Sequence, residues 1–213
     1  MKRYILFDND GVLVDTEPWY YEAGVRALAD IGFVLDAEKY RRDTSLGLGT
    51  WAQVRAAGID EKTIERQRAA RDRYYQEFLR TGAIEIEGVV ETLAELSTLV
   101  RMAIVTTAKR ADFEIIHEHR RIRAFMDFVV IREDYERAKP HPDPYLLALR
   151  RFGATKEATL IVEDSPRGLA AAVAAGIDCA VVSSGFTWSS DFSEATFHIE
   201  SLRELRDIVL AAP

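Results

Sequence analysis

Short apolar runs alternate along the chain with longer segments in which apolar residues recur every three or four positions. The short runs are rich in β-branched residues and predict five strands, at Tyr4–Phe7, Arg101–Thr106, Phe128–Ile131, Thr159–Val162 and Cys179–Val182. The longer segments predict helices whose apolar stripes are Val89, Leu93, Leu96 and Val100, then Tyr145, Leu146, Leu149 and Phe152, then Leu169, Ala170, Val173 and Ala174. This alternation predicts an α/β fold with a doubly wound parallel sheet, that is, a Rossmann-like core.

The alternation stops after the first predicted strand. From Asp15 to about Ile84 the apolar spacing is helical throughout, with stripes at Tyr20, Gly24, Ala27, Leu28 and Ile31 and at Tyr75, Phe78 and Leu79. We therefore predict an all-helical insertion at residues 15–84, and a core formed by residues 1–14 and 85–213. The charged run Glu61–Arg80 is interpreted as a solvated helix with local ion pairs such as Glu65–Arg68 and Arg73–Glu77.

The helix after the fourth strand carries clear end signals. Ser165 is the expected N-cap, Pro166 lies in the first turn and Gly176 follows the last turn. Trp19, which lies near the first predicted strand, is expected either to line a pocket or to pack within the protein, and the same two alternatives apply to Trp51 and Trp188. His117 and His119 lie two positions apart on a predicted helix, so they face different directions and do not form a metal-binding pair.

Composition narrows the class of protein. The chain has 213 residues, 48% of them hydrophobic, and 28 basic against 35 acidic residues give a net charge of −7, which argues against a general nucleic-acid binder. Cys179 is the single cysteine, so an internal disulfide framework is excluded and a buried structural thiol is expected. The first apolar run stops at Asp8, and no stretch approaches the roughly 20 apolar residues of a membrane span. We expect a cytoplasmic protein with no membrane partner.

The tetrapeptide Asp8-Asn9-Asp10-Gly11 follows the first predicted strand directly. Ligands of open α/β sheets bind at the carboxyl ends of the strands. Alternation along an extended chain sends Asp8 and Asp10 to the same side, and Gly11 permits a tight turn. Two converging carboxylates repel each other, so they require a proton, a metal ion or a covalent role.

Three further polar groups are predicted to reach the same edge of the sheet. Thr106 and Thr107 end the second strand, and Glu163-Asp164 ends the fourth. Lys139 precedes a helix in a predicted loop and adds an ammonium group. The sequence therefore predicts a cluster of carboxylates, hydroxyls and one lysine.

These four motifs, in this order, resemble those of the haloacid dehalogenase superfamily, most of whose members are magnesium-dependent phosphotransferases. The segments Asp10–Glu17 and Glu163–Gly168 are similar to the branch that contains β-phosphoglucomutase and phosphoglycolate phosphatase. The resemblance runs from Tyr4 to about Gly185. It implies that the helical insertion is a mobile cap, hinged near Asp15 and residues 81–88, that shields the pocket from water.

The resemblance also implies roles for individual residues. Asp8 corresponds to the nucleophile that forms an aspartyl-phosphate, and Asp10 to the general acid and base. The ligands expected for Mg²⁺ are the side chains of Asp8 and Asp164 and the backbone carbonyl of Asp10, with Glu163 as an outer or alternative ligand. The groups expected to bind the phosphate oxygens are Thr106, Thr107 and Lys139.

The function implied is hydrolysis of a small phosphorylated metabolite by a phosphatase. The alternative within the family is a β-phosphoglucomutase-like sugar-phosphate isomerase, which has a cap histidine and a lysine–arginine clamp. This chain has Tyr20 and the segment Thr44–Trp51 in the corresponding places, without those residues. A second alternative is a catalytically idle protein that binds a phosphorylated ligand, but such proteins usually lose a catalytic carboxylate. Asn9 replaces the apolar residue that is common between the two aspartates.

Overall fold

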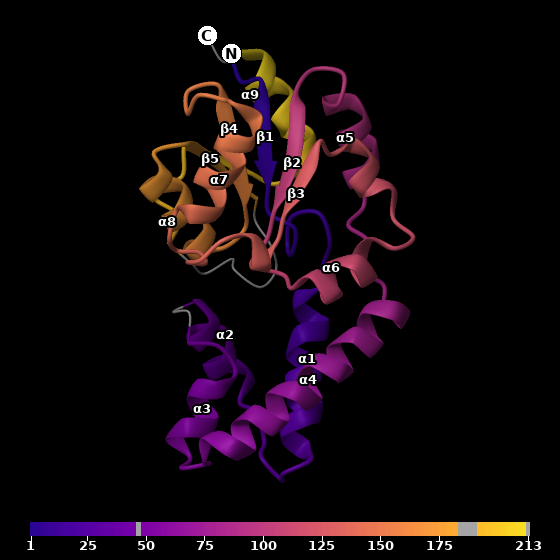
Figure 1. Cartoon of the computed structure of the whole chain (residues 1–213), viewed down its shortest axis with the longest axis vertical. Coiled ribbons are helices and arrows are strands. Elements are labelled where there is room, and N and C mark those ends of the chain that lie inside the picture. Colours follow the sequence, from indigo (N-terminus) through magenta and orange to yellow (C-terminus); the bar gives the residue numbers. More distant parts are fainter. Residues whose placement is uncertain (46–47, 183–190, 212–213) are drawn as a thin grey trace. The chain divides into compact units, whose positions relative to one another are not determined.

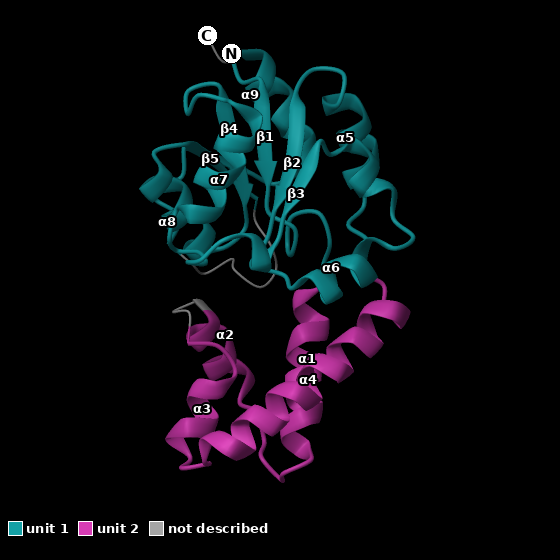
Figure 2. Ribbon diagram, viewed as in Figure 1, with its two compact units in different colours: residues 1–15, 85–213 teal, residues 16–84 magenta. Residues whose placement is uncertain are grey.

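The chain divides into two compact units (Figure 2). The computed structural model describes residues 1–45, 48–182 and 191–211. One unit, here called the core unit, comprises residues 1–15 and 85–213, and the other, the helical unit, comprises residues 16–84. This division differs from the one drawn from the sequence by a single residue, Asp15, which lies in the core unit.

The core unit contains a six-stranded sheet in which every neighbouring pair is parallel (Figure 1). Its strands, in the spatial order β3-β2-β1-β4-β5-β6, are β3 (Phe128–Val130), β2 (Arg101–Val105), β1 (Tyr4–Phe7), β4 (Thr159–Glu163), β5 (Asp178–Val182) and β6 (Phe197–Ile199). The parallel α/β fold predicted from the sequence is therefore confirmed. The three-residue edge strand β6 was not predicted.

Helices cover both faces of this sheet. They are α5 (Val89–Leu96), α6 (Arg110–His117), α7 (Asp143–Phe152), α8 (Pro166–Ala175) and α9 (Leu205–Ala211), with 3₁₀ turns η1 (Arg121–Phe125), η2 (Arg132–Asp134) and η3 (Leu202–Glu204). Helices α7 and α8 pack against each other and against strands β2 to β5, whereas α5 packs with η1 and η3. The step from β1 to β2 past α5 and the step from β4 to β5 past α8 go in opposite directions along the strand order. Because crossover connections are right-handed, α5 and α8 lie on opposite faces of the sheet.

The predicted end signals of α8 are confirmed, but its predicted apolar stripe is wrong. The Ser165 hydroxyl accepts a hydrogen bond from the Gly168 amide, and Gly176 ends the helix with a φ of +67°. The buried positions are Gly168, Leu169, Ala171, Ala172 and Ala175, while Val173 is 41% exposed. A run of alanines gives little contrast between faces, so its spacing could not define the buried side.

The helical unit contains four helices within its described residues. They are α1 (Glu17–Ala29), α2 (Ala37–Ser45), α3 (Trp51–Ala56) and α4 (Glu61–Thr81). Helices α1 and α4 pack along each other, and the buried Trp51 and the hydrogen bond from Trp19 Nε1 to the Ala83 carbonyl (3.0 Å) stabilise this unit. Trp188 lies outside the described residues. No helix in the described ranges has the length and apolar character needed to cross a membrane.

The sequence predicts that the charged run of α4 is solvated throughout, and the structure shows that part of it is buried. Arg71 is buried, pairs with Asp72 (2.9 Å) and stacks 4.3 Å from the centre of the Tyr20 ring. The guanidinium group is planar and weakly hydrated, so it can be buried against an aromatic face. Glu77, which we had paired with Arg73, forms its ion pair with Arg26 of α1 (3.4 Å).

The chain passes from the core unit to the helical unit after Asp15 and returns before Glu85, and the core residues at these two points contact each other. Val14 and Glu85 form an isolated antiparallel bridge, and Glu85 also forms an ion pair with Arg120 (2.8 Å). The residues at which the chain leaves and re-enters the core unit are therefore neighbours.

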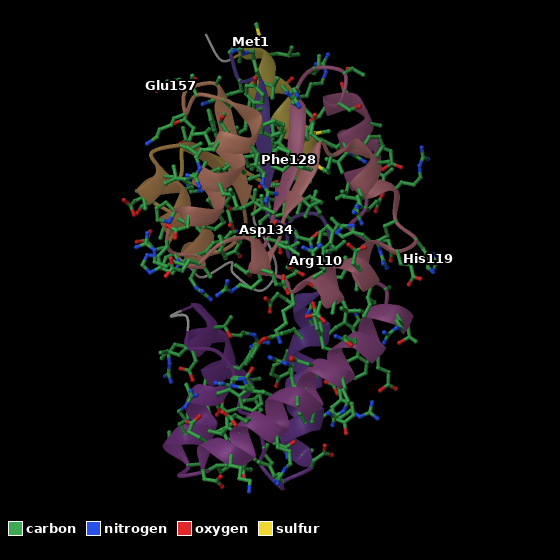
Figure 3. All side chains as sticks on the ribbon, in the orientation of Figure 1. Met1, Arg110, His119, Phe128, Asp134 and Glu157 are labelled. Atoms are coloured by element: carbon green, nitrogen blue, oxygen red, sulfur yellow. The ribbon has the colours of Figure 1, made fainter. Side chains whose placement is uncertain are left out.

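At the amino end of the sheet a buried lysine joins three strands. Lys2 is 5% exposed, and its ammonium donates to the carbonyls of Glu157 and Thr159 (2.8 Å each) and pairs with Asp178 (2.7 Å). Figure 3 shows Met1 and Glu157 at this end of the molecule. The lysine precedes β1, while its partners flank β4 and begin β5, so this contact fixes the three strands to one another.

Replacing this lysine should destabilise the core unit. Lys2→Met keeps the aliphatic part of the side chain but leaves two carbonyls and one carboxylate without their donor. We expect the free energy of unfolding to fall by about 2 kcal/mol, measured by urea denaturation. The control is Lys156→Met at an exposed lysine of the same unit. Equal stability of the two variants would contradict the structural role of Lys2.

Candidate active site

The predicted site residues lie at the point where the strand order of the sheet reverses. Strands β1 and β4 are direct neighbours, with Phe7 opposite Val162, so Asp8 and Glu163 leave the sheet side by side. The amide of Asp8 donates to the Val162 carbonyl (2.9 Å), which continues this pairing. Such reversal points at the carboxyl ends of parallel strands are the usual ligand sites of open α/β sheets.

Lys139 is the centre of the site. Its ammonium donates to Asp8 Oδ1 (2.7 Å), to Glu163 Oε1 (2.7 Å) and to the Val105 carbonyl (3.0 Å). The residue is 4% exposed, so these three acceptors replace the water that the ammonium loses on burial. The lysine therefore links the ends of β1, β2 and β4 at one point.

Glu163 is fully buried and both of its oxygens are engaged. Oε1 accepts from Lys139 and from the Tyr145 hydroxyl (2.5 Å), and Oε2 accepts from the Asp164 amide (3.2 Å) and the Ser165 hydroxyl (3.1 Å). A carboxylate with this many donors is fixed in orientation. Glu163 thus holds Lys139 on one side and the start of α8 on the other.

The cluster contains three acidic side chains, Asp8, Glu163 and Asp164, beside the one ammonium group of Lys139. Burial raises the pKa of Asp8 to about 7, against the opposing effect of Lys139, and the carboxylates of Glu163 and Asp10 add to the increase. Burial would lower the pKa of Lys139, but the neighbouring carboxylates of Asp8 and Glu163 raise it above its ordinary value, so the lysine is protonated. Lys139 therefore favours the ionised form of Asp8, while burial and the neighbouring acids oppose it.

This donor set fits a hard divalent cation. Asp8, Glu163 and Asp164 each offer a carboxylate oxygen, and these oxygens lie within 4.8 Å of one another. Carboxylate oxygens are the ligands that Mg²⁺ prefers, and a cation would reduce the mutual repulsion of ionised carboxylates at this spacing. Both oxygens of Glu163 accept hydrogen bonds from protein donors, whereas Lys139 donates to only one oxygen of Asp8, Oδ1.

Two glycines make room for these carboxylates. A Cβ atom at Gly11, where φ is +78°, would lie 1.9 Å from Asp164 Oδ2. A Cβ atom at Gly168 would lie 1.8 to 2.0 Å from the carboxyl group of Glu163. Both distances are far below van der Waals contact, so only glycine permits the acidic groups to occupy these positions.

Asp10 and the threonines complete the predicted set. The Thr106 hydroxyl, fully buried, lies 3.4 Å from Asp10 Oδ2 and accepts a hydrogen bond from the Ala108 amide (3.0 Å). Among the residues predicted to form the site, Thr107 is the one with an exposed side chain. The structure thus brings together Asp8, Lys139, Glu163 and Asp164, and links Thr106 to Asp10.

Sequence reasoning missed three residues that contact this cluster or its loop. Tyr145 was assigned to the apolar stripe of α7, yet its hydroxyl bonds Glu163. Arg167 donates to the carbonyl of Lys139. Asn9 is hydrogen-bonded to His117 (2.8 Å). Each partner is distant along the chain, so no local pattern in the sequence indicated these contacts.

Comparison with known proteins gives consistent relatives. Protein CbbY of Rhodobacter capsulatus is 31% identical over 213 residues, covering 94% of this chain and 93% of the relative. A phosphoglycolate phosphatase of Salmonella paratyphi A is 30% identical over 217 residues, covering 91% and 84% respectively. Among solved structures, a CbbY variant from Rhodobacter sphaeroides in complex with xylulose-(1,5)bisphosphate superposes with a TM-score of 0.80 at 28% identity, covering 96% of both chains.

The family comparison covers all four motifs. The haloacid dehalogenase-like hydrolases match residues 5–182, a span that includes Asp8, Thr106, Lys139 and Asp164. The resemblance inferred from the sequence is thereby confirmed, and this chain belongs to the haloacid dehalogenase-like hydrolase family.

Proposed function

We propose that the protein is a magnesium-dependent phosphatase that hydrolyses a small phosphorylated metabolite through an aspartyl-phosphate on Asp8. The observation that carries this proposal is the contact of one buried ammonium, Lys139, with Asp8 and Glu163 beside a third carboxylate, Asp164. The names of the relatives, phosphoglycolate phosphatase and phosphorylated carbohydrates phosphatase, support a phosphorylated carbohydrate or hydroxy acid as the substrate class.

Asp8 is the proposed nucleophile. Lys139 donates to Oδ1, so we assign Oδ2 as the oxygen that attacks phosphorus. A bond forms between Oδ2 and phosphorus while the bond from phosphorus to the substrate's ester oxygen breaks, and the alcohol departs. Attack of water on the same phosphorus then releases inorganic phosphate and restores the carboxylate.

Asp10 is proposed to move the protons. It lies two residues beyond Asp8, and its Oδ2 is 3.4 Å from the Thr106 hydroxyl. In the first step its carboxylic acid protonates the departing alkoxide, and in the second step the resulting carboxylate removes a proton from the attacking water. Each cycle therefore returns Asp10 to its starting protonation state.

Charge neutralisation is divided between Lys139 and a metal ion. The fixed ammonium of Lys139 stabilises the carboxylate of Asp8 and the equatorial oxygens of the transferring group. Asp8, Asp164 and the carbonyl of Asp10 would hold Mg²⁺, with Glu163 as an outer residue. When bound, the ion supplies positive charge that lets an anionic substrate approach an anionic nucleophile.

The two alternatives make different predictions. A sugar-phosphate isomerase needs a cationic clamp for the second phosphate of its intermediate, and the segment Thr44–Trp51 offers none in its sequence. Leu46 and Gly47 of this segment lie outside the described residues. A catalytically idle binding protein would not need both Asp8 and Asp10.

A substrate panel separates these functions directly. Purified protein with Mg²⁺ would be incubated with phosphoglycolate, several sugar phosphates, nucleotides and 4-nitrophenyl phosphate, and phosphate release would be measured. We expect release from one or more alkyl phosphates. Isomerisation without phosphate release would favour the isomerase, and binding without turnover would favour the idle protein.

Removing the nucleophile should abolish turnover. Asp8→Asn replaces the attacking oxygen with an amide and should lower kcat by at least about 1,000-fold while circular dichroism remains unchanged. Asp207→Asn, at an 86% exposed side chain in the same unit, is the matched control and should retain full activity. Normal turnover by Asp8→Asn would remove Asp8 from the mechanism.

Phosphate release should require Mg²⁺, and the affinity for Mg²⁺ should depend on Asp164. Chelation with EDTA should abolish phosphate release, and Mg²⁺ should restore it. In Asp164→Asn, which has one fewer anionic ligand, the Mg²⁺ concentration for half-maximal activity should rise by about tenfold or more. Full activity in EDTA, or an unchanged Mg²⁺ requirement in the variant, would be incompatible with the proposed ligand set.

A further inference from the structure

A buried hydrogen bond ties the loop of the two aspartates to helix α6. His117, the last residue of α6, lies with Nε2 2.8 Å from Asn9 Oδ1. Asn9 is fully buried and His117 is 5% exposed, with the Phe113 ring 4.4 Å from the imidazole. Asn9 lies between Asp8 and Asp10, at the bend that follows β1.

The imidazole is neutral and its tautomer follows from the contact. The oxygen Asn9 Oδ1 can only accept, so the proton lies on His117 Nε2. Burial lowers the pKa of His117 to about 4, and the positive charges of Arg120 and Arg123 add to this effect. The histidine therefore donates to Asn9 without carrying a charge at neutral pH.

Stability alone does not explain this pair. Within the described part of the chain, neither Asn9 Nδ2 nor His117 Nδ1 has a hydrogen-bond partner. A buried polar atom without a partner costs about 1 to 3 kcal/mol, whereas two apolar side chains of similar volume would cost nothing of this kind. Two apolar side chains in place of Asn9 and His117 would therefore give the protein at least the same free energy of unfolding.

The contact acts on a part of the loop that Lys139 does not contact. The carbonyl of Asn9 accepts the amides of Leu13 (2.8 Å) and Val14 (3.1 Å), so Asn9 is the residue around which the loop turns. Asp8 is already fixed by Lys139. The peptide that follows Asn9 carries Asp10, whose carboxylate makes a long contact of 3.4 Å with Thr106.

We propose that His117 is a positioning residue that acts through Asn9 to hold Asp10 where it can protonate the leaving group. The inference rests on the proposed function, because it concerns the proton that Asp10 gives to the departing alkoxide. It assigns a role in the reaction to α6 and to the polar residue between the two aspartates.

The experiment compares substrates whose leaving groups differ in their need for that proton. An alkyl phosphate releases an alkoxide that must be protonated, whereas 4-nitrophenyl phosphate releases a stable phenolate. The value of kcat/KM reports the steps up to the first irreversible one, which is departure of the leaving group. We define the alkyl-to-aryl ratio as kcat/KM for an alkyl phosphate divided by kcat/KM for 4-nitrophenyl phosphate. The alkyl phosphate is phosphoglycolate or the best sugar phosphate of the panel. This ratio therefore measures how well Asp10 protonates the leaving group.

Four variants separate positioning from packing. His117→Leu removes the donor, and His117→Gln keeps an amide donor at a similar reach. Asn9→Leu combined with His117→Leu replaces both polar groups by apolar ones. His119→Leu is the matched control, since His119 is 87% exposed and projects from the surface (Figure 3).

We expect the alkyl-to-aryl ratio to fall by about tenfold in His117→Leu and in the double variant, as for other residues that orient a catalytic group. It should stay within about twofold of the parent chain in His117→Gln and His119→Leu. The double variant should unfold at the same urea concentration as the parent chain or a higher one. In the parent chain, ¹⁵N NMR of the imidazole should show protonated Nε2 at pH 7, and Asn9→Leu should change that signal.

Several results would overturn the inference. An unchanged ratio in His117→Leu, with an active parent chain and an inactive Asp8→Asn, would reject it and leave the proposed function intact. A ratio restored in the double variant would show that the pair only fills space. An Nε2 without a proton would remove the hydrogen bond. A parent chain that releases phosphate from no substrate would reject the proposed function, and this inference with it.

Discussion

The ammonium of Lys139 is the interaction on which the site depends. It contacts the ends of β1, β2 and β4 together, through Asp8, the Val105 carbonyl and Glu163. Buried carboxylates at this spacing repel one another, and without a fixed cation the strand ends would separate or the acids would take up protons. Tyr145 strengthens the arrangement by donating to Glu163, so a single network sets both the geometry and the charge of the cluster.

Much of the fold and of the acidic cluster could be predicted because the signals are local. A parallel strand buried on both faces is a continuous apolar run, and its end is marked by the first polar residue, as at Asp8. Motif order then brought Lys139 and Asp164 to the same edge through the rules of parallel sheets. The sequence therefore predicts the structure well at positions whose surroundings are determined by residues nearby in the sequence.

The remaining features depend on partners that are distant in sequence. The bond between Asn9 and His117 joins residues 108 positions apart, and neither position signals the other. The buried face of α8 follows from the close approach of Gly168 to Glu163, which the apolar spacing of an alanine-rich helix does not encode. Arg71 resembles its exposed neighbours in sequence, and its burial is explained by the Tyr20 and Trp51 rings beside it, which are distant along the chain.

The bridge between Val14 and Glu85 means that the core sheet does not depend on chain continuity through the four-helix segment. Cutting out residues 16–84 would leave two peptide ends near enough for a few residues to reconnect them. All members of the acidic cluster belong to the larger unit, so recombination could exchange one helical module for another at this junction without moving them. Such a chain can diversify by replacing a whole module as well as by point substitution.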